Sequence, residues 1–397
     1  MVSVSEASAI IQSHPFIPRT ENIALTQACG RVLAEPIVAD RDLPPFDRVA
    51  MDGIAIQHAQ FAKGDPSFPI EGVAAAGQPQ HHLHNAAHCY EVMTGAPLPI
   101  NTDTVVRYED LSIADHKARI LLDKILPGQN VHQRGADAKK NEALLLPGQI
   151  ISPAEITIIA SVGKSTVKIK TLPEAAIIST GDELVGLDEQ PQAHQIRKSN
   201  SYALHAALQT LGGTASLYHL TDSKEEIKKT LNNVIAQHDL LILSGGVSQG
   251  KFDFIPSVLN ELGVVQHFHK VKQKPGKPFW FGTMGTKTVF ALPGNPVSTY
   301  LCFYKYIKSW IRKSLGVAYV KNFAILAHDF EFLPDLTCFL EVQTVNEKGR
   351  LVAYPQVGRG SGDFANLKKT NGFLELPDGK NHFKGGEIFP VHLFRND

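Results

Sequence analysis

The sequence lacks the features that would place the protein in a membrane, in the secretory pathway or on a nucleic acid. No apolar run approaches the roughly 18 residues that a membrane-spanning helix needs. The first residues, Met1 to Glu6, show no cationic segment followed by an apolar run, so we expect no signal peptide. Lys and Arg number 39 and so do Asp and Glu, which argues against a nucleic-acid binder steered by net charge and leaves a local basic groove as the alternative.

Cysteine is also scarce, with four residues in 397 and no C-x-x-C pair. In a chain of this length we expect reduced, mostly buried thiols and a cytosolic protein. Histidine is more plentiful, and the tract His81-His82-Leu83-His84 is a candidate for metal binding. The tract is polar, lies between Pro and Gly turns and has no carboxylate or cysteine beside it in sequence, so an exposed loop is the favoured interpretation.

Internal repeats and low-complexity tracts are absent as well. Apolar residues make up 43% of the chain and charged residues 20%, which is typical of globular folds and unlike disorder. Because 397 residues exceed one ordinary domain, we expect two to four domains.

Two separated segments, residues 1–39 and 146–173, are expected to form one extended helical domain. Ser3-x-x-Glu6 is a capping box, and a second helix is expected over Leu25 to Leu33. Ser152-Pro153-Ala154-Glu155 combines an N-cap serine, a proline at the first helical position and a glutamate at the third. The chain therefore returns at residue 146 to a helical layer like the one it left.

Two other segments contain short strand-like runs with no helical period. Residues 40–145 are broken by many Gly and Pro residues, which predicts a small barrel or sandwich inserted between the two helical segments. Residues 316–397 follow a break at Gly316 and predict a second small β domain.

Residues 174–315 alternate aliphatic strands with amphipathic helices. This pattern indicates a parallel sheet covered by helices on both faces. The expected strands are Ala175–Ser179, Ala215–Leu220, Leu240–Leu243 and Val289–Leu292, and the expected helix caps are Asn200 and Ser223.

Three loops that follow these strands are rich in glycine and hydroxyl residues. Ligands of an open parallel sheet bind beyond the carboxyl ends of its strands. Glycine allows close backbone approach, and N–H groups at a helix start bind oxyanions, so we expect an anionic ligand here. The candidate residues are Thr180, Gly181, Asp182, Glu183, Ser244, Gly245, Gly246, Ser248, Pro293, Gly294, Asn295, Pro296 and Ser298.

A nucleotide-binding P-loop is the alternative for the second loop. Gly245-x-x-x-x-Gly250-Lys251 matches the front half of that pattern, but Phe252 stands where Ser or Thr must bind magnesium. No separate strand ending in the required Asp is evident. The P-loop interpretation is therefore not favoured.

A lysine pair and a group of carboxylates complete the candidate site. The segment Lys274-Pro275-Gly276-Lys277-Pro278 is stiffened by proline, which favours a clamp for an anion over a solvated turn. Carboxylates next to a phosphate site are explained by Mg²⁺ between them, although any single one is as readily a helix cap or a surface charge. These carboxylates are Asp182, Glu183, Asp222 and Asp253.

The order of these motifs points to a known family. They read TGDEL (180–184), SGGVS (244–248), KPGKP (274–278) and LPGNPVS (292–298). The β module adds PFDRVAMDG (45–53), MTGAPLP (93–99) and QRGAD (133–137). Together they resemble the MoeA family of molybdopterin molybdenumtransferases and the homologous C-terminal domain of gephyrin, over nearly the whole chain except a weakly matched final domain.

The resemblance implies a multidomain α/β plus β fold: an extended helical domain with an inserted β module, a molybdopterin-binding α/β domain and a C-terminal β barrel. It also implies an elongated homodimer with active sites shared between chains. Asp52, Thr94, Arg134 and Asp137 of one chain would then face Glu183, Asp222 and Asp253 of the other. Lys274, Lys277 and Ser298 match positions linked to molybdate and adenylyl-molybdopterin.

The implied reaction converts adenylyl-molybdopterin and molybdate into molybdenum cofactor and AMP, with Mg²⁺ on Glu183, Asp222 and Asp253. The adenylyltransferase of the preceding step is a possible partner, and neither nucleic acid nor a membrane is expected. The alternatives are a gephyrin-like scaffold without turnover, or a single-domain adenylyltransferase, which leaves the β insertion and tail unexplained.

The chain also departs from the family's pattern. Lys198-Ser199-Asn200 stands where members often carry Asp-x-Asn, Val49 stands where many have Ser, and the final domain lacks a clear Arg-x-Asp/Glu-Phe-x-Arg segment. Residues 367–372 (LKKTNG) replace a commoner Ser-x-x-Ala-Asn-Gly. The resemblance therefore implies no oxyanion contact from the C-terminal domain.

Overall fold

A computed structural model describes residues 1–221, 223–247, 253–318 and 320–395. The chain folds into two compact units, each described by itself below. The larger unit comprises Met1–Ala34, Gly148–Ser152 and Thr166–Asp397, and the smaller comprises Glu35–Pro147 and Pro153–Ser165. The finer division into four domains stays a prediction.

The N-terminal part of the larger unit is less helical than expected. Helix α1 (Val4–Gln12) has the predicted capping box, with the Ser3 hydroxyl accepting from the Glu6 amide at 3.1 Å. The helix expected over residues 25–33 is wrong: only a 3-10 turn, η1 (Leu25–Gln27), precedes strand β2 (Val32–Leu33). Gly30 turns the chain with φ +80°. Both residues of β2 are buried in a three-stranded sheet, in which β13 (Thr166–Lys170) lies between β1 (Thr20–Ala24) and β2. Burial in this sheet therefore overrides local helix propensity.

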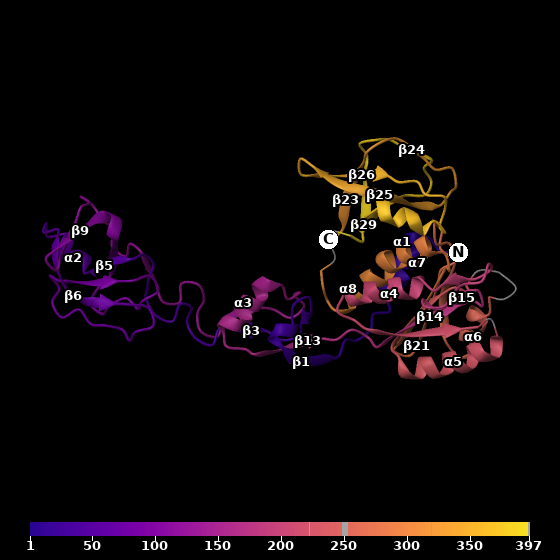
Figure 1. The fold of residues 1–397 in the computed structure, drawn as a ribbon, viewed down its shortest axis with the longest axis horizontal. Coiled ribbons are helices and arrows are strands. Elements are labelled where there is room, and N and C mark those ends of the chain that lie inside the picture. Colours follow the sequence, from indigo (N-terminus) through magenta and orange to yellow (C-terminus); the bar gives the residue numbers. More distant parts are fainter. Residues whose placement is uncertain (222, 248–252, 319, 396–397) are drawn as a thin grey trace. The chain divides into compact units, whose positions relative to one another are not determined.

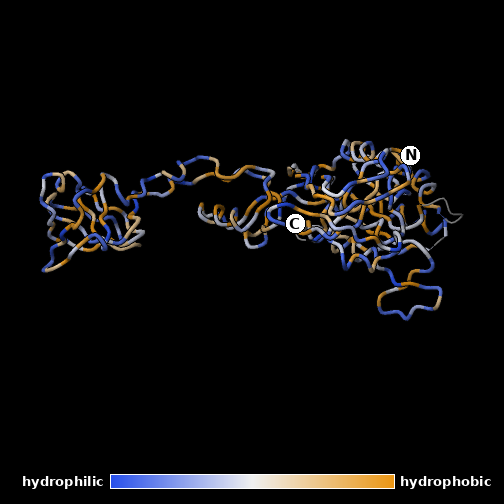
Figure 2. Tube along the Cα trace, turned by 90° about the horizontal axis from the view of Figure 1, so that it is seen from above, coloured by the Kyte–Doolittle hydropathy of each residue, from blue (hydrophilic) through white to orange (hydrophobic). Residues whose placement is uncertain are grey.

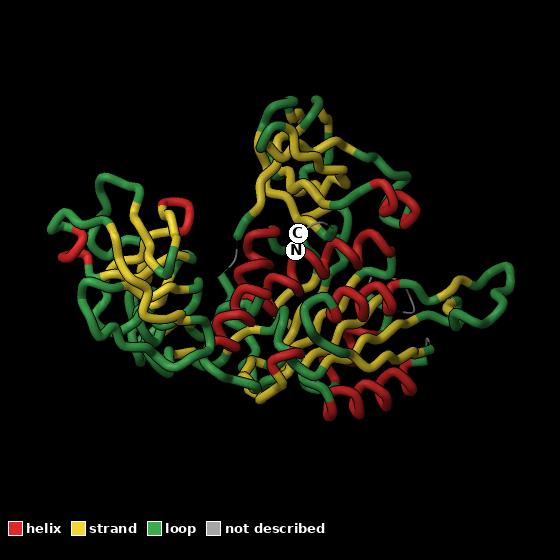
Figure 3. Tube along the Cα trace, turned by 60° about the vertical axis from the view of Figure 1, so that its left-hand side comes forward, coloured by secondary structure: helices red, strands yellow, loops and turns green. Residues whose placement is uncertain are grey.

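The central sheet of the larger unit has the order β17-β14-β18-β22-β21-β19. Its strands β14 and β21 are labelled in Figure 1. The first four strands are parallel, as predicted, and the last two add an antiparallel edge. The strands are β14 (Ala175–Thr180), β17 (Ala215–Leu220), β18 (Leu240–Ser244), β22 (Lys287–Leu292), β21 (Trp280–Met284) and β19 (Val265–His269). A short pair, β15 (Leu184–Val185) and β16 (Ile196–Arg197), carries a loop that extends from the sheet (Figure 3).

Helices cover both faces of this sheet because successive residues of each buried strand point to opposite sides. Ile177 and Ile242 lie in one apolar core with α4, α7 and α8, whereas Ile178 and Leu243 lie in a second core with α5 and α6. Hydrophobic segments accordingly run through the interior of the larger unit (Figure 2). The helices are α4 (Asn200–Gln209), α5 (Lys224–Gln237), α6 (Ile255–Glu261), α7 (Pro296–Cys302) and α8 (Lys308–Ser314), with a π-helical turn, η3 (Phe303–Ile307), between the last two.

The C-terminal residues form a closed β barrel, as the resemblance implied. The strand order is β20-β25-β26-β23-β29-β27, and β25 also pairs with β27, which closes the barrel. Strand β20 (Gln273–Lys274) comes from the α/β segment and adds to β25 in parallel. The other elements are β23 (Asn322–Leu326), β25 (Thr337–Glu347), β26 (Arg350–Pro355), β27 (Gly372–Leu376), β29 (Ile388–Leu393), the pair β24 (Phe330–Glu331) and β28 (His382–Phe383), and η4 (Phe364–Lys369).

A charged group lies partly buried against this barrel. The Glu375 carboxylate is 2.6 Å from Lys305 Nζ and 2.7 Å from His392 Nε2. Burial alone would raise the pKa of Glu375, but the His392 hydrogen bond and Lys305 lower that pKa to about 2. Burial likewise lowers the pKa of His392. The group thus favours an ionised Glu375 beside a neutral imidazole.

The smaller unit contains the predicted β module. Its six-stranded sheet has the order β8-β5-β7-β6-β10-β9, flanked by the pairs β11–β4 and β12–β3. Helix α3 (Pro153–Ser161) begins at the predicted proline. The remaining elements are β3 (Ile37–Val38), β4 (Arg48–Val49), β5 (Gly53–Ile56), α2 (His58–Phe61), β6 (Ser67–Ala74), β7 (Cys89–Val92), β8 (Thr104–Arg107), η2 (Tyr108–Asp110), β9 (Leu111–Ala114), β10 (Lys117–Ile120), β11 (Val131–His132) and β12 (Ala143–Leu145); β1 (Thr20–Ala24) and β13 (Thr166–Lys170) belong to the larger unit. Across the described residues, no helix has both the length and the apolar character to span a bilayer.

Candidate functional site

A cavity of about 870 Å³ lies at the carboxyl ends of β14, β18 and β22. The three predicted loops meet there because parallel strands present their carboxyl ends at one edge of a sheet. The first loop contributes Thr180, Gly181 and Glu183, the second Ser244, Gly245 and Gly246, and the third Pro293, Gly294, Asn295 and Pro296. Asp182 and Ser298 are not among the lining residues, and Ser298 is buried within α7.

Glycine at the second loop permits a close approach to the first. Gly245 has φ +102°, and a Cβ on it would lie 2.7 Å from Thr180 Oγ1. Gly246 has φ +70° and would bring a Cβ within 2.7 Å of Ile255 Cγ1. Larger residues would therefore meet both backbone strain and collision, so the glycines fix the shape of the cavity.

Asn200 ties the second and third loops together, a role that the sequence did not reveal. Asn200 was predicted to be the N-cap of α4, but it is the first residue of the helix, and the N-cap is Ser199. The side-chain amide of Asn200 donates to Ser244 Oγ at 2.9 Å and to the Gly294 carbonyl at 2.7 Å. The capping assignment was wrong because Asn200 already lies inside the helix, and its amide instead links two different loops.

Charges of both signs surround the cavity. The carboxylates of Glu183 and Asp253 line it, as do the cations Arg197 and Lys198. Arg197 donates to the carbonyls of Leu187 at 3.0 Å and Glu189 at 3.2 Å, which holds the loop between β15 and β16. Lys198 adds positive charge to this wall.

Asp222, Ser248 and the Gly250–Phe252 part of the P-loop-like pattern lie outside the described residues. Within the described part of the chain, no three His, Cys, Asp or Glu side chains are grouped closely enough to hold a metal ion. Among the described residues that line this cavity, the carboxylates that could bind a cation are those of Glu183 and Asp253.

The structure does not bring Lys274 and Lys277 into this cavity. Both side chains are exposed, and of their segment only Pro278 is a lining residue. Lys274 Nζ lies 5.8 Å from the centre of the Phe332 ring. The buried amide of Gln273 donates to the carbonyls of Pro275 at 3.2 Å and Gly276 at 3.3 Å, so Gln273 shapes the turn that carries the lysines.

In the smaller unit, Asp52 and Thr94 form a close pair. Asp52 Oδ1 accepts from the Thr94 amide at 2.6 Å and from its hydroxyl at 2.7 Å. The backbone hydrogen bond, and then the side-chain one, lower the pKa of Asp52. Asp52 is therefore a fixed, ionised carboxylate near neutral pH.

Arg134 and Asp137 lie in a neighbouring hydrogen-bonded group of the same unit. Arg134 Nε donates to Asp42 at 2.8 Å, and Asp137 is 2.9 Å from His132 Nε2. His132 is in β11, which pairs with β4, and Val49 of β4 accepts from the Gly95 amide at 2.9 Å. Strand β4 thus connects this group to the loop of Thr94.

The histidine tract forms a loop, as predicted, but a carboxylate lies beside it in space. Glu71 of β6 is 3.4 Å from His84 Nδ1 and 3.0 Å from His88 Nδ1. Burial would raise the pKa of Glu71, yet amide hydrogen bonds from His84 and Asn85 lower it. The sequence around the histidine tract contains no carboxylate, but folding brings the Glu71 carboxylate next to it.

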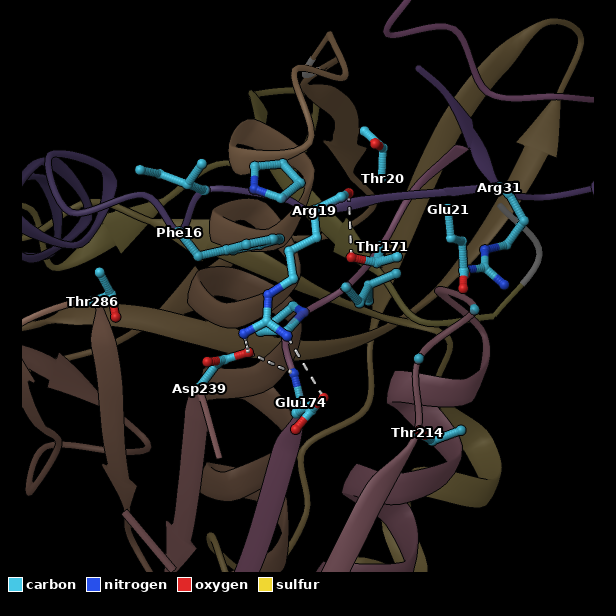
Figure 4. A pocket seen from close by; sticks show the side chains of 16 residues that line it. Phe16, Arg19, Thr20, Glu21, Arg31, Thr171, Glu174, Thr214, Asp239 and Thr286 are labelled. Carbon is cyan, nitrogen blue, oxygen red and sulfur yellow. Dashed lines mark hydrogen bonds and ion pairs between the residues drawn. The ribbon is translucent and has the colours of Figure 1, made fainter. Parts of the chain in front are cut away.

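A second cavity of about 590 Å³ lies at the amino ends of the same parallel strands (Figure 4). Glu174 and Asp239 directly precede β14 and β18, and the Arg19 guanidinium lies 3.8 Å from each carboxylate. None of the predicted site residues lines this cavity.

The C-terminal barrel contributes to the first cavity through the segment 358–364. Gly362 and Phe364 are lining residues. Ser361 Oγ accepts from Asn295 Nδ2 at 2.8 Å, and the Ser361 carbonyl accepts from the Val297 amide at 3.2 Å. Although the final domain departs from the family's pattern, it reaches the cavity at the start of α7.

Three family models match successive parts of the chain. Residues 2–163 match the MoeA N-terminal region (domain I and II), residues 176–313 match a probable molybdopterin binding domain, and residues 324–394 match the MoeA C-terminal region (domain IV). Their order agrees with the β module, the α/β sheet and the barrel.

Similar proteins match over their whole length. A molybdopterin molybdenumtransferase of Synechocystis sp. is 41% identical over 99% of this chain and 100% of its own. One of Haemophilus influenzae is 31% identical over 100% of this chain and 99% of its own. The solved structure of a molybdopterin biosynthesis MoeA protein from Pyrococcus horikoshii OT3 has a TM-score of 0.86, with 28% identity over 99% of this chain and 100% of that chain.

Proposed function

Because the chain belongs to the MoeA family, we propose that it is a molybdopterin molybdenumtransferase acting in molybdenum cofactor biosynthesis. It would convert adenylyl-molybdopterin and molybdate into molybdenum cofactor and AMP. The observation that supports this best is the meeting of three glycine- and hydroxyl-rich loops around one cavity of the α/β sheet. A gephyrin-like scaffold without turnover is not favoured, since the curated relatives above are named as enzymes.

The three loops are proposed to bind the pterin nucleotide. Glycine at positions 245 and 246 lets the backbone of the second loop approach phosphate oxygens closely, and Thr180 and Ser244 add hydroxyl donors. No covalent nucleophile is needed, because the dithiolene sulfurs of the pterin bind the metal themselves. The protein's contribution is then to position two anions and to stabilise their charge.

The donor set of the cavity fits Mg²⁺. Glu183 and Asp253 supply carboxylate oxygens at the same cavity, and Mg²⁺ combines one or two carboxylates with substrate phosphates and retained waters. With Asp222 they would hold the ion, which neutralises phosphate charge when bound.

We propose that Lys274 and Lys277 attract molybdate to the mouth of this site. Their support is two exposed ammonium groups on a turn fixed by Gln273, with Pro278 of the same segment at the cavity wall. Ser298 is buried in α7 and would contribute indirectly, by holding this helix against the third loop.

The active unit is proposed to be a homodimer in the cytosol. As the family resemblance implies, Asp52, Thr94, Arg134 and Asp137 would complete the cavity of a partner chain. Hydrogen bonds within the smaller unit fix the positions of these side chains. The adenylyltransferase of the preceding step is a proposed transient partner that hands over its product.

The decisive experiment is turnover by the purified protein. It would be incubated with adenylyl-molybdopterin, Mg²⁺ and molybdate, while AMP release and activation of a cofactor-free molybdoenzyme are followed. Both signals are expected to require molybdate, and Glu183→Gln serves as the matched control that removes one charge. AMP release without molybdoenzyme activation would indicate simple hydrolysis and contradict the proposed transfer.

A further inference from the structure

Burial of a phenylalanine side chain stabilises a fold, yet 65% of Phe364 is exposed. A single exposed phenylalanine is common on protein surfaces. This one, however, lines the wall of the polar cavity at the carboxyl end of the sheet. Its exposure therefore leaves an aromatic face available to whatever occupies that cavity.

The backbone that carries Phe364 is anchored on both sides. Towards the sheet, Ser361 is bonded to Asn295 and Val297, as described above. Towards the barrel, Asn366 Nδ2 donates to Glu341 Oε2 at 2.9 Å and to the Gln356 carbonyl at 2.7 Å. A ring on such a fixed segment loses little conformational entropy when a ligand binds against it.

Phe364 also differs in kind from the other side chains of the cavity. The remaining described lining residues are glycines, prolines, hydroxyl residues, charged residues, Asn and the aliphatic Leu184, Ile196 and Val247, and none of them is aromatic. The Arg197 guanidinium is also flat, but it donates to the carbonyls of Leu187 and Glu189. Phe364 is therefore the aromatic face that the described residues offer to a heterocycle in this cavity.

We propose that Phe364 is the stacking platform for a planar heterocycle of the substrate. This inference rests on the proposed function, whose substrate carries two such groups, adenine and pterin. A planar base stacks on an aromatic side chain whatever its ring substituents, because every base has a π face, and this stacking contributes substantially to binding. Phe364 would accordingly set the affinity for the nucleotide without taking part in the transfer.

The test measures equilibrium binding of AMP, neopterin and pyrophosphate to the full chain by calorimetry. Phe364→Ala is expected to weaken binding of AMP or of neopterin about 5- to 100-fold, with pyrophosphate binding unchanged. Phe364→Tyr should bind as the wild type does, and Phe364→Leu should recover only part of the loss. Phe323→Ala is the matched control, since Phe323 is 51% exposed on β23 and does not line the cavity.

A second readout uses the fluorescence of an introduced tryptophan, because the protein's own two, Trp280 and Trp310, are both buried. In Phe364→Trp the new indole is the exposed fluorophore, so AMP should quench its emission while pyrophosphate should not. Unchanged AMP and neopterin affinities in Phe364→Ala, or full affinity in Phe364→Leu, would overturn the stacking while leaving the proposed function intact. A wild type that binds none of the three ligands would instead overturn the proposed function and the stacking with it.

Discussion

Replacing Asn200 by alanine should loosen the candidate site and lower the stability of the larger unit. The change removes the amide that donates to Ser244 Oγ at 2.9 Å and to the Gly294 carbonyl at 2.7 Å. Each such hydrogen bond contributes about 0.5–1.5 kcal/mol net, so the pair contributes roughly 1–3 kcal/mol. The larger unit has about 270 residues, for which this corresponds to a decrease in Tm of roughly 2–5 °C.

Thermal unfolding followed by circular dichroism measures this effect, and pyrophosphate binding reports the loosened loops. Asn232→Ala in α5 is the matched control, because Asn232 is exposed and the same exchange there reports only the gain in helix propensity. Asn200→Asp should be no better than Asn200→Ala, since a carboxylate cannot donate to the Gly294 carbonyl. An unchanged Tm together with unchanged pyrophosphate affinity in Asn200→Ala would refute the tether.

Three further predictions concern charge. Asp52→Ala and Glu183→Ala should each abolish turnover without unfolding, and mixing them should restore part of the activity in heterodimers; absence of rescue despite proven subunit exchange would contradict a shared site. Lys274→Ala or Lys277→Ala should raise the molybdate requirement by roughly ten-fold, and more than the pterin requirement; a molybdate titration of AMP release that does not shift would show that the lysines serve another anion. The Glu375 carboxylate has a folded-state pKa of about 2 against an ordinary 4.5, so its stabilisation is present above pH 4.5 and is lost as the pH falls towards 2. Tm measured from pH 7 to pH 3 should therefore fall less steeply in Glu375→Gln than in the wild type, and parallel curves would disprove this.

The sequence predicted those elements whose signals are local. The capping box at Ser3, the proline-started helix at Pro153 and the aliphatic strands before Thr180 and Ser244 are each specified within a few residues, and all are confirmed. The edge of the sheet where loops gather also follows from parallel pairing alone.

What the sequence did not predict depends on distant partners. Residues 25–33 have acceptable helix propensity, but Val32 and Leu33 gain more from a sheet with β13. The role of Asn200 requires two loops that are 44 and 94 residues away. Glu71 beside the histidines and Phe364 at the cavity are likewise contacts between elements, for which one sequence carries no periodic signal.

The pairing of β20 with β25 makes the order of synthesis matter. A ribosome that has released the chain as far as Leu315 has supplied all three loops of the cavity, but neither Phe364 nor the strand that β20 pairs with. The turn with Lys274 and Lys277 follows directly on β20, so its final geometry waits for the barrel. A nascent chain can therefore complete its central sheet well before the segment of Gly362 and Phe364 completes the wall of the cavity.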